Sequence, residues 1–502
     1  MRDVYLAPHE IGSGGRTSVI ADHCRMFLNE GLQPTVLTFG YSRNIGQIGA
    51  NFRREYNLPD AVRVRNIHSD LLRRNTEDST LDWSRAEDED VEGLLAQDDE
   101  YGSKGYVRYF DARGEYVKFR RWTQGGAPVQ TTYFRHRRPV FRRNYTAAGF
   151  CGMEEHYDPR TGRVSQERYY TPDGYCYASR WLNPDDGKHS GLFVFDRDTG
   201  KVRRFANNVP WHVAWLDSVI RESAEKPILI AHSPGAARKV IRIDPSLAEL
   251  VFVWHENHLE APYTAGSAIR PEYADTFKRF SDMPLALFAT EAQAQDLRVR
   301  YPKAKNIATV SPIVRDKRIS DSVQTDPGRV GVFCRLRPNK RVDHIVRAMA
   351  GVIDAVPHAT LHVFGRGPEL PRLEELAGTL KEEGKIVFHG RVEEVGDEIA
   401  RCQVTVSTSA VESFGLSIGE SLAAGTPVVA YDIKYGPRDI IRDGVDGYLV
   451  PSGDEKRLKQ RVVDVLKNEK RAARMGREGQ ARVNRLYSAA EVSRRWRELV
   501  LD

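Results

Sequence analysis

The chain has 502 residues, of which 40% are hydrophobic and 29% are charged, so its length allows three or four domains with buried cores. This composition excludes a chain that is disordered as a whole. The formal net charge is only +6, which is too small over this length for a protein built mainly to coat nucleic acid.

The five cysteines are widely scattered, with no C-x-x-C pair and no spacing typical of metal ligands. We therefore expect neither a disulfide scaffold nor a metal site. The first residues lack a basic segment followed by an apolar run, and no stretch approaches the roughly 18 apolar residues that span a bilayer. These features predict a cytoplasmic protein without a membrane span.

Residues 1–62 predict the opening of a parallel sheet. An apolar run at 4–7 precedes a glycine-rich loop, apolar residues then recur with helical spacing up to residue 27, and a second apolar run covers 34–39. Strand, loop, helix and strand in this order indicate the first part of an N-terminal Rossmann-like domain.

Residues 63–205 differ in composition and predict an insertion. Residues 77–100 hold eleven acidic side chains and one basic one, whereas 101–145 hold eleven Lys and Arg against two acidic residues. Residues 101–205 carry 21 of the 47 aromatics, in short runs separated by turn sequences that begin at Asp111, Asp158, Thr171 and Asp196. This pattern predicts an acidic segment followed by an antiparallel β-meander.

The α/β pattern then resumes. Strands are predicted at 227–231, 250–254 and 285–289 in the second part of the N-terminal domain, 206–312. A C-terminal Rossmann-like domain at 313–485 has strands predicted at 330–336, 360–364, 386–389, 404–407 and 428–431, with a helix over 342–356. Residues 486–502 include a helix at 490–501 that returns to the N-terminal domain. The fold class is α/β, with a central cleft where the strands of both domains end.

The segment 407–420 is the richest in candidate functional residues. A strand ends there, a polar loop follows, and a helix begins near Gly415, so that Glu412 lies in the loop and Glu420 about one turn into the helix. Backbone N–H groups at a helix start bind phosphate well, and carboxylates accept hydrogen bonds from sugar hydroxyls. Glu412 also suits a carboxylate that balances the helix dipole, and Glu420 a solvated surface residue.

Two cations are expected at the same edge of the C-terminal sheet. Arg335 ends its first strand and Lys340 precedes its first helix, where they could stabilise a leaving diphosphate, although both also fit ordinary surface cations. Gly14 and Gly15 do not form a G-x-G-x-x-G fingerprint, and they suit either a bare turn or a close approach to phosphate.

Two histidines follow a buried strand of the N-terminal domain. His255 and His258 flank Glu256 without forming H-E-x-x-H, so zinc is not indicated. Each fits a buried structural histidine, whereas the position after the strand end favours contact with a ligand.

Together these residues resemble glycosyltransferase family 4, of the GT-B fold. The resemblance is carried by Glu412-x7-Glu420, by Arg335 and Lys340, by Gly14 and Gly15, and by the segment AGTPVVAYD at 424–432. The sequence DIKYGPRD at 432–439 and YYTPDGY at 169–175 are similar to the branch that contains wall-teichoic-acid α-glycosyltransferases and the glycosyltransferases of Ser/Thr-rich adhesins. Members of that branch carry a similar inserted meander.

The resemblance implies a role for each matching position. Arg335 and Lys340 would hold the donor diphosphate, Glu420 the ribose and Glu412 the sugar, while Phe414, Gly415 and Leu416 would complete the cradle by their backbone. Gly15, beside Gly14, would approach the diphosphate, and His255 or His258 would meet the sugar or the acceptor. The family transfers sugars with retention and without a metal, and it uses no cofactor beyond the UDP-sugar donor.

The function implied is transfer of glucose or N-acetylglucosamine from UDP-glucose or UDP-N-acetylglucosamine to a polyanionic polyol-phosphate acceptor, wall teichoic acid. The basic meander fits that acceptor, although its cations could instead pair with the acidic segment. Two alternatives stay open: O-glycosylation of a Ser/Thr-rich adhesin, and a catalytically inactive subunit that binds through the meander. The exposed meander also predicts a homo-oligomer, with a trimer as one candidate, and no nucleic-acid partner is expected.

Overall fold

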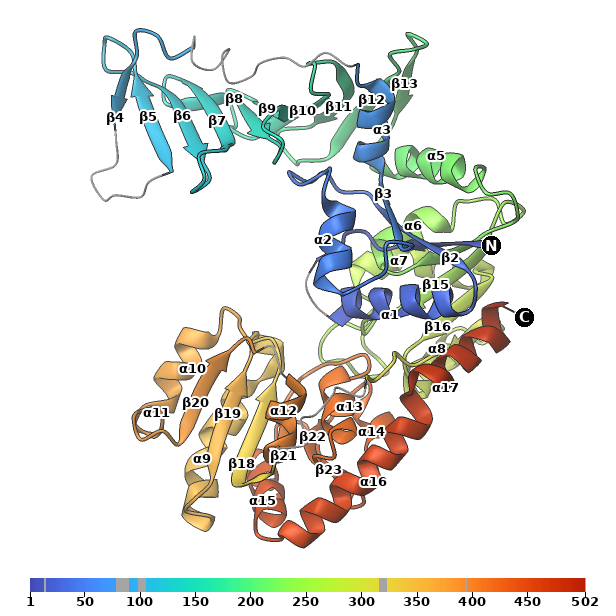
Figure 1. The fold of residues 1–502 in the computed structure, drawn as a ribbon, viewed down its shortest axis with the longest axis vertical. Coiled ribbons are helices and arrows are strands. Elements are labelled where there is room, and N and C mark those ends of the chain that lie inside the picture. Colours follow the sequence, from blue (N-terminus) through green and yellow to red (C-terminus); the bar gives the residue numbers. More distant parts are fainter. Residues whose placement is uncertain (13–14, 78–89, 98–104, 316–322, 393–394, 502) are drawn as a thin grey trace. The chain divides into compact units, whose positions relative to one another are not determined.

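The fold is that of a computed structural model, which describes residues 1–12, 15–77, 90–97, 105–315, 323–392 and 395–501. The chain divides into two compact units. The first unit comprises residues 1–12, 27–231 and 235–249, and the second comprises 13–26, 232–234 and 250–502. Within the described residues the strands form three sheets (Figure 1).

The first sheet is built of parallel pairs in the order β17-β16-β15-β14-β1-β2-β3. Its strands are β1 (Asp3–Ala7), β2 (Gln33–Thr38), β3 (Arg63–Asn66), β14 (Ile228–Ala231), β15 (Glu249–Trp254), β16 (Leu285–Phe288) and β17 (Ile307–Thr309). The helices between them are α1 (Gly15–Asn29), α2 (Ile48–Glu55), α3 (Ile67–Asn75), α5 (Asn208–Ile220), α6 (Pro234–Val240), α7 (Pro271–Phe277) and α8 (Glu291–Arg300). The three strands expected after the insertion therefore join this sheet, as predicted, and β17 adds a fourth that was not expected.

Residues 63–66 differ from the expectation that the insertion begins at residue 63. They form β3, which pairs in parallel with β2 and aligns Val64 with Val36. The sequence Arg-Val-Arg-Asn lacks an apolar run because β3 is an edge strand, and Arg63 is exposed there. The first sheet thus continues beyond residue 62.

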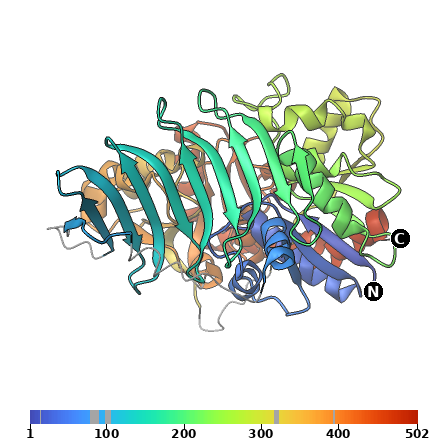
Figure 2. The ribbon, with the colours of Figure 1, turned by 90° about the horizontal axis from the view of Figure 1, so that it is seen from above.

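The second sheet is the predicted antiparallel meander, and each strand bonds to its neighbours in the chain. Its strands are β4 (Leu95–Gln97), β5 (Tyr106–Phe110), β6 (Tyr116–Trp122), β7 (Pro128–Arg135), β8 (Arg138–Tyr145), β9 (Cys151–Tyr157), β10 (Val164–Tyr170), β11 (Cys176–Leu182), β12 (His189–Phe195) and β13 (Val202–Phe205). Figure 2 shows the meander strands side by side. The four predicted turn sequences all connect adjacent strands, and each ends in a glycine with positive φ: Gly114, Gly162, Gly174 and Gly200.

Aromatic packing joins the meander to α3. Tyr169 and Tyr177 are buried against Leu71 and Leu72 of that helix. The Tyr177 hydroxyl shares a hydrogen bond of 3.2 Å with Nδ1 of buried His68, so its polar end has a partner. This contact holds β10 and β11 against α3 within the first unit.

Ion pairs take up part of the meander's positive charge. Arg143 pairs with Glu154 across two strands at 3.1 Å, and Lys118 pairs with Asp90 of the acidic segment at 3.2 Å. Pairing with the acidic segment therefore occurs, as the alternative interpretation of the charges requires. Much of that segment, 78–89 and 98–100, and the start of the basic stretch, 101–104, lie outside the described residues. Arg135 and Arg137, in contrast, are exposed at a hairpin turn.

The third sheet is parallel, with the order β20-β19-β18-β21-β22-β23. Its strands are β18 (Asp326–Phe333), β19 (Thr360–Phe364), β20 (Ile386–Gly390), β21 (Cys402–Ser407), β22 (Val428–Asp432) and β23 (Gly447–Pro451). Its helices are α9 (Val342–Ala355), α10 (Leu370–Ala377), α11 (Thr379–Glu382), α12 (Val395–Ala400), α13 (Leu416–Ala423), α14 (Pro437–Ile440), α15 (Glu455–Leu466), α16 (Glu469–Tyr487) and α17 (Ala489–Trp496).

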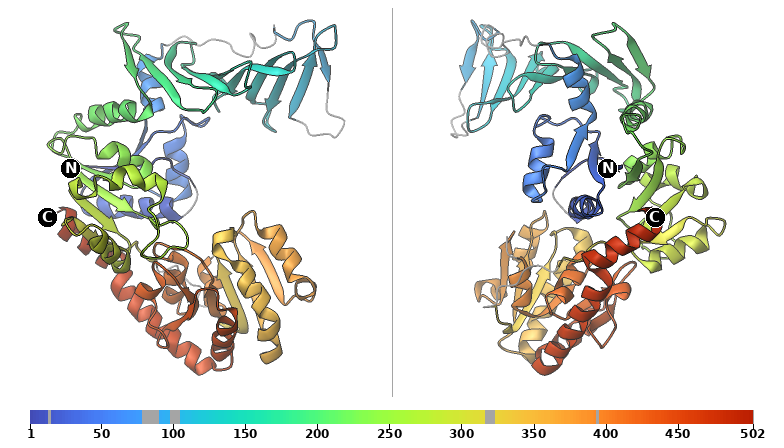
Figure 3. Two further views of the ribbon diagram at one scale, coloured as in Figure 1. Left: turned by 180° about the vertical axis from the view of Figure 1, so that it is seen from behind. Right: turned by 45° about the vertical axis from the view of Figure 1, so that its right-hand side comes forward.

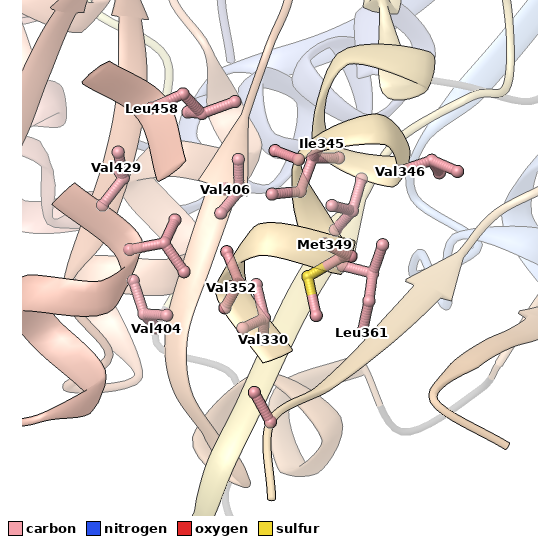
Figure 4. Packing of buried hydrophobic residues seen from close by; sticks show 14 of the residues in the cluster. Val330, Ile345, Val346, Met349, Val352, Leu361, Val404, Val406, Val429 and Leu458 are labelled. Carbon is pink, nitrogen blue, oxygen red and sulfur yellow. The ribbon is translucent and has the colours of Figure 1, made fainter. Parts of the chain in front are cut away.

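Helix α9 covers one face of this sheet because its apolar residues recur every three or four positions. Ile345, Met349 and Val352 of α9 pack on Val330 and Val406, all at most 4% exposed (Figure 4). Burying branched apolar side chains contributes roughly 1.5–3 kcal/mol each, so this cluster is a main source of the unit's stability.

Two strands of the third sheet differ from prediction. The first strand of the third sheet ends at Phe333 rather than at residue 336, because the next residues turn away to bond with the loop after β19. The edge strand β23 was not predicted as a strand, because its glycine and proline weaken the strand pattern.

The C-terminal helices are placed by aromatic contacts within the second unit. Helix α17 ends at Trp496, and a short π-helix, Arg497–Leu501, follows it (Figure 3). The Trp496 ring meets His23 of α1 edge-on, with 4.9 Å between the ring centroids, so the end of α17 contacts α1. Among the described residues, no helix is both long and apolar enough to cross a membrane.

Candidate functional site

The candidate residues of the third sheet gather where β18 and β21 end, in the second unit. The loop from Thr408 to Gly415 joins β21 to α13, and the short turn Pro338–Lys340 follows β18. Since the carboxyl ends of parallel strands meet at one edge, these two loops are neighbours. The Thr408 hydroxyl donates to the Lys340 carbonyl oxygen at 2.9 Å, which ties them together.

Glu412 and Lys340 form an ion pair in this loop. Their side chains are only 17% and 20% exposed, so the pair is largely shielded from water. The Ser409 hydroxyl donates to the same carboxylate oxygen, Oε1, at 2.8 Å, and the Tyr435 N–H donates to the Glu412 carbonyl at 3.0 Å. Glu412 is therefore held from both its side chain and its backbone, which supports a role beyond that of a simple helix-dipole carboxylate.

Arg335 is exposed and precedes Lys340 in the same loop. Two glycines fix the backbone of the residues on either side of Arg335. A Cβ on Gly365 would lie 1.8 Å from the Cys334 carbonyl, and one on Gly367 would lie 2.0 Å from that of Leu336. Only glycine permits this approach, so the Gly365-Arg-Gly367 turn packs closely against the segment that carries Arg335. Burial raises the pKa of the neighbouring Cys334 thiol to about 12.

Helix α13 begins as predicted. Gly415 has φ +95° and precedes Leu416, whose N–H belongs to the first turn, which has no acceptor inside the helix. Phe414 is buried, and a Cβ on Gly436 would lie 1.7 Å from its carbonyl oxygen. Glu420 lies in the second turn of the helix.

Gly15 contributes to the same unit. A Cβ at Gly15 would have Leu416 as its nearest neighbour, at 3.6 Å, which is an ordinary contact. Gly15 and the start of α13 are thus close together, although they are 400 residues apart in the chain. Gly14 lies outside the described residues.

The two candidate histidines have different surroundings. His255 remains partly exposed, stacks on His232 with 5.1 Å between ring centroids, and shares a hydrogen bond of 2.8 Å with it. Burial and the charge of Arg16 lower the pKa of His255 to about 3, so its ring is neutral at pH 7. The Ser413 hydroxyl donates to the His255 carbonyl at 2.6 Å, which joins this residue to the Glu412 loop.

His258, by contrast, is only 1% exposed. Its ring lies parallel to that of Tyr435 at 6.0 Å, and its Nδ1 lies 3.2 Å from the Gln293 amide. Burial lowers the pKa of His258 to about 4. The surroundings of His258 are those of a packed structural histidine.

The sequence patterns did not indicate Asp296, which is linked to the Glu412 loop through Tyr435. This carboxylate of α8 accepts from the Tyr435 hydroxyl at 2.7 Å and pairs with Lys434. The Lys434 carbonyl accepts from the Asn257 amide at 3.0 Å. No local pattern signals Asp296, because its partners lie 138 and 139 positions away.

The arrangement can hold a phosphorylated sugar. The shielded carboxylate of Glu412 suits sugar hydroxyls, and the cations Lys340 and Arg335 suit a diphosphate. The start of α13 suits phosphate oxygens. Among the described residues, no group of three or more His, Cys, Asp or Glu side chains could hold a metal ion.

Comparison with protein families gives one match. Residues 315–482 match the family described as glycosyl transferases group 1. Over 503 residues, covering 99% of both chains, the sequence is 24% identical to poly(ribitol-phosphate) alpha-N-acetylglucosaminyltransferase of Staphylococcus aureus strain COL. It is 21% identical over 376 residues to poly(glycerol-phosphate) alpha-glucosyltransferase of Bacillus subtilis strain 168, covering 73% of this chain and 55% of that relative.

Solved structures show the fold. A variant of S. aureus TarM, solved with fondaparinux, alpha-GlcNAc-glycerol and UDP, superposes with a TM-score of 0.87 at 23% identity, covering 99% of both chains. The pneumococcal O-GlcNAc transferase GtfA, in complex with UDP and GlcNAc, gives 0.75 at 20% identity, covering 100% of this chain and 99% of that one. The GT-B fold with an antiparallel insertion is thereby confirmed.

Proposed function

We propose, from the match of residues 315–482 to the glycosyl transferases group 1 family, that the chain is a retaining hexosyltransferase. It transfers glucose or N-acetylglucosamine from a UDP-sugar to a polyol-phosphate chain of the teichoic-acid type. The names of the S. aureus and B. subtilis relatives support this acceptor class. In this proposal, residues 313–485 bind the nucleotide sugar and the N-terminal α/β region serves the acceptor.

The observation that carries the proposal is the shielded pair of Glu412 and Lys340, held beside the start of α13. Glu412 accepts hydrogen bonds from the sugar, while Lys340 and Arg335 neutralise the diphosphate. Backbone N–H groups from Phe414 to Leu416 complete the phosphate cradle. Glu420 binds the ribose, and Gly14 and Gly15 allow the first loop to approach the diphosphate.

Chemistry in this site needs no side chain as a general base. The bond between the anomeric carbon and the diphosphate oxygen breaks as the acceptor oxygen attacks from the same face. The acceptor's proton passes to the departing phosphate oxygen, so charge and protons balance within the two substrates. The protein supplies position and positive charge. Metal-independence is part of this proposal.

His255, rather than His258, is proposed to face the sugar or the acceptor. His255 keeps part of its surface exposed, whereas His258 is buried under Tyr435. Because the His255 ring is neutral, it would offer a hydrogen bond rather than a charge.

A second candidate function is O-glycosylation of a Ser/Thr-rich protein. The GtfA subunit of Streptococcus pneumoniae, named a peptide N-acetylglucosaminyltransferase, is 25% identical over 374 residues, covering 72% of this chain and 64% of that relative. The exposed arginines of the meander favour the polyanionic acceptor over this alternative.

We also propose self-association through the meander, residues 101–205. Its last strand, β13, is an edge strand whose Val202 is 56% exposed, and Trp181 is 45% exposed on β11. Unpaired edges and exposed apolar residues favour contact with a second copy. Sedimentation at several concentrations tests this, and a monomer throughout would contradict it.

Release of UDP tests the function. Purified protein is incubated with UDP-glucose or UDP-N-acetylglucosamine, with and without poly(ribitol phosphate) or poly(glycerol phosphate). We expect release that depends on the polymer and that Lys340→Ala lowers by about 100-fold or more, a loss of ~2.7 kcal/mol in transition-state binding. Lys381→Ala is the matched control, because this lysine pairs with Glu374 at a surface of the same unit.

The other outcomes discriminate between the alternatives. Release that requires a Ser/Thr-rich peptide instead of the polymer would move the assignment to protein glycosylation. No release with any donor and acceptor, from folded protein, would favour the inactive binding subunit.

A further inference from the structure

A groove of about 700 Å³ opens between α2 and α3 in the first unit. Ile45, Ile48, Val64 and Leu72 give it an apolar lining, and Arg53 and Arg73 add two positive charges. Nothing in the proposed donor site involves these residues, since that site lies in the second unit.

Local interactions fix the shape of the groove. The Ser69 hydroxyl donates to the Ile45 carbonyl at 3.0 Å, which ties the loop before α2 to the first turn of α3. Asn66 caps α3 by accepting from the N–H groups of His68 and Ser69. A Cβ on Gly46 would meet nothing within 4 Å, so this glycine leaves open space in the lining.

The two arginines have little compensating charge. Arg73 is 78% exposed and lies 3.8 Å from Asp70, whose carboxylate Arg65 already holds at 2.7 Å. Arg53 pairs at 3.3 Å with Asp60, which is fully exposed, and it also donates to the Val62 carbonyl at 3.3 Å. Pairs of this kind are worth about 0–1 kcal/mol, so both cations are available to an anion at small cost. The one acidic lining residue, Glu77, is engaged by Arg197 at 3.2 Å.

The groove borders the contact between α3 and the meander. Leu72 lines the groove and also packs against the cluster of Tyr169 and Tyr177. The groove and the meander therefore share one residue of their lining and packing within the first unit.

We propose that this groove binds a segment of the polyol-phosphate acceptor away from the reacting sugar. Arginine presents a planar fork to a phosphodiester, and the carbon backbone of the polyol fits an apolar floor. The inference rests on the proposed function and deepens it, because it names residues that select a polymer over a single polyol.

The test compares three variants of the full chain. Arg73→Glu reverses one charge of the groove, and Gly46→Phe fills the open space at Gly46 in its lining. Arg54→Glu is the matched control, because Arg54 is on α2 and exposed but does not line the groove. Calorimetric titration with poly(ribitol phosphate) gives binding, and UDP release gives KM for the polymer and for a single polyol phosphate.

We expect Arg73→Glu and Gly46→Phe to weaken polymer binding and raise its KM by about 10-fold or more, which corresponds to ~1.4 kcal/mol. Turnover at saturation, the KM for the UDP-sugar and the KM for a single polyol phosphate should stay unchanged. Arg54→Glu should change binding by less than about 3-fold, in line with a surface charge outside the groove lining.

Equal weakening by all three variants would overturn the proposal in favour of general electrostatic attraction. Unchanged polymer binding in Arg73→Glu and Gly46→Phe would also overturn it, as would tighter binding of a Ser/Thr-rich peptide in the same groove. If the wild type binds the polymer through Arg73 but transfers no sugar to it, the groove stands and the proposed function fails.

Discussion

Glu412 and Lys340 neutralise each other in the structure, and in the proposed reaction they act on different parts of one donor. Glu412 would turn to the sugar and Lys340 to the diphosphate. Because both side chains are shielded, removing one partner leaves the other with an uncompensated, poorly hydrated charge.

The first prediction concerns Glu412→Gln, which keeps the size of the side chain and removes its charge. We expect kcat/KM for transfer to fall by about 100-fold, since charge-assisted hydrogen bonds are worth roughly 1.5–3 kcal/mol. UDP release measures this, with thermal unfolding as a check on folding. Glu374→Gln, in an exposed pair with Lys381, should have activity close to wild type. Activity retained in Glu412→Gln would remove Glu412 from the site.

Lys239 of α6 is a buried lysine that forms no ion pair with a carboxylate among the residues that the structure describes. It is 3% exposed, its Nζ lies 3.0 Å from Nδ1 of His9, and it lies 3.7 Å from the centre of the Phe39 ring. Burial, with a smaller contribution from the charge of Arg238, lowers the pKa of Lys239 to about 7.

The second prediction follows from that lowered pKa. Between pH 7 and pH 10 the unfolded chain keeps the Lys239 proton and the folded chain releases it, so this residue makes stability rise with pH. The slope is at most about 1.4 kcal/mol per pH unit. Lys239→Met should lose this rise, which urea unfolding midpoints at pH 6, 7.5 and 9 would reveal. Parallel pH profiles for wild type and variant would contradict the assignment.

At the scale of the elements, the Glu412 loop depends on a second loop that packs against it. Gly436 precedes α14, has φ +102°, and lies so close to Phe414 that a side chain cannot fit. Tyr435 beside it bonds the Glu412 backbone and Asp296. The geometry of the site thus comes from packing between β22, α8 and the loop after β21.

The third prediction uses two glycines with similar backbone strain. Gly436→Ala must displace Phe414, so it should cost several kcal/mol and lower transfer activity. Gly444 also has positive φ, +76°, but a Cβ on it would meet nothing within 4 Å. We expect Gly444→Ala to lower the free energy of unfolding by only about 1 kcal/mol and to leave activity intact. Unfolding midpoints and UDP release measure both, and equal losses would show that strain alone matters.

Sequence patterns predicted the buried elements well and the irregular ones poorly. Residues 360–364 form β19 as expected, because an alternating apolar run buried between two strands leaves little ambiguity. The edge strand β3 has too little apolar character to be found, and the glycine and proline of β23 weaken its strand pattern. Of the site, residues at strand ends, such as Lys340 and Glu412, could be placed together from topology. Asp296 could not, because its role arises only from contacts distant in sequence.

At the scale of the whole molecule, the mild net charge of +6 conceals local clusters. Exposed arginines occur at the hairpin turn of residues 135–138, while Lys118 pairs with Asp90 of the acidic segment and Arg143 with Glu154 of the neighbouring strand. A polyanionic acceptor would therefore meet selected cations rather than a uniformly basic surface.

The fourth prediction is that KM for the polyol-phosphate polymer rises steeply with salt. The Debye length falls from about 10 Å at 0.1 M salt to about 3 Å at 1 M, which weakens exposed contacts between arginine and phosphate. KM for a single polyol phosphate should rise much less, since it makes fewer such contacts. Kinetics at several salt concentrations would show this, and equal salt dependence for both acceptors would argue against an extended binding surface.

The meander has one further property, which follows from its strand order. Among the described residues, each strand bonds to its neighbours along the chain and the sheet contains no crossover connection that would fix the number of strands. Removing or duplicating one hairpin changes the count by two, which preserves both strand direction and the face on which each residue lies. Evolution can therefore adjust the length of this sheet in steps of one hairpin, and with it the span of polymer contacted, without altering the catalytic half of the protein.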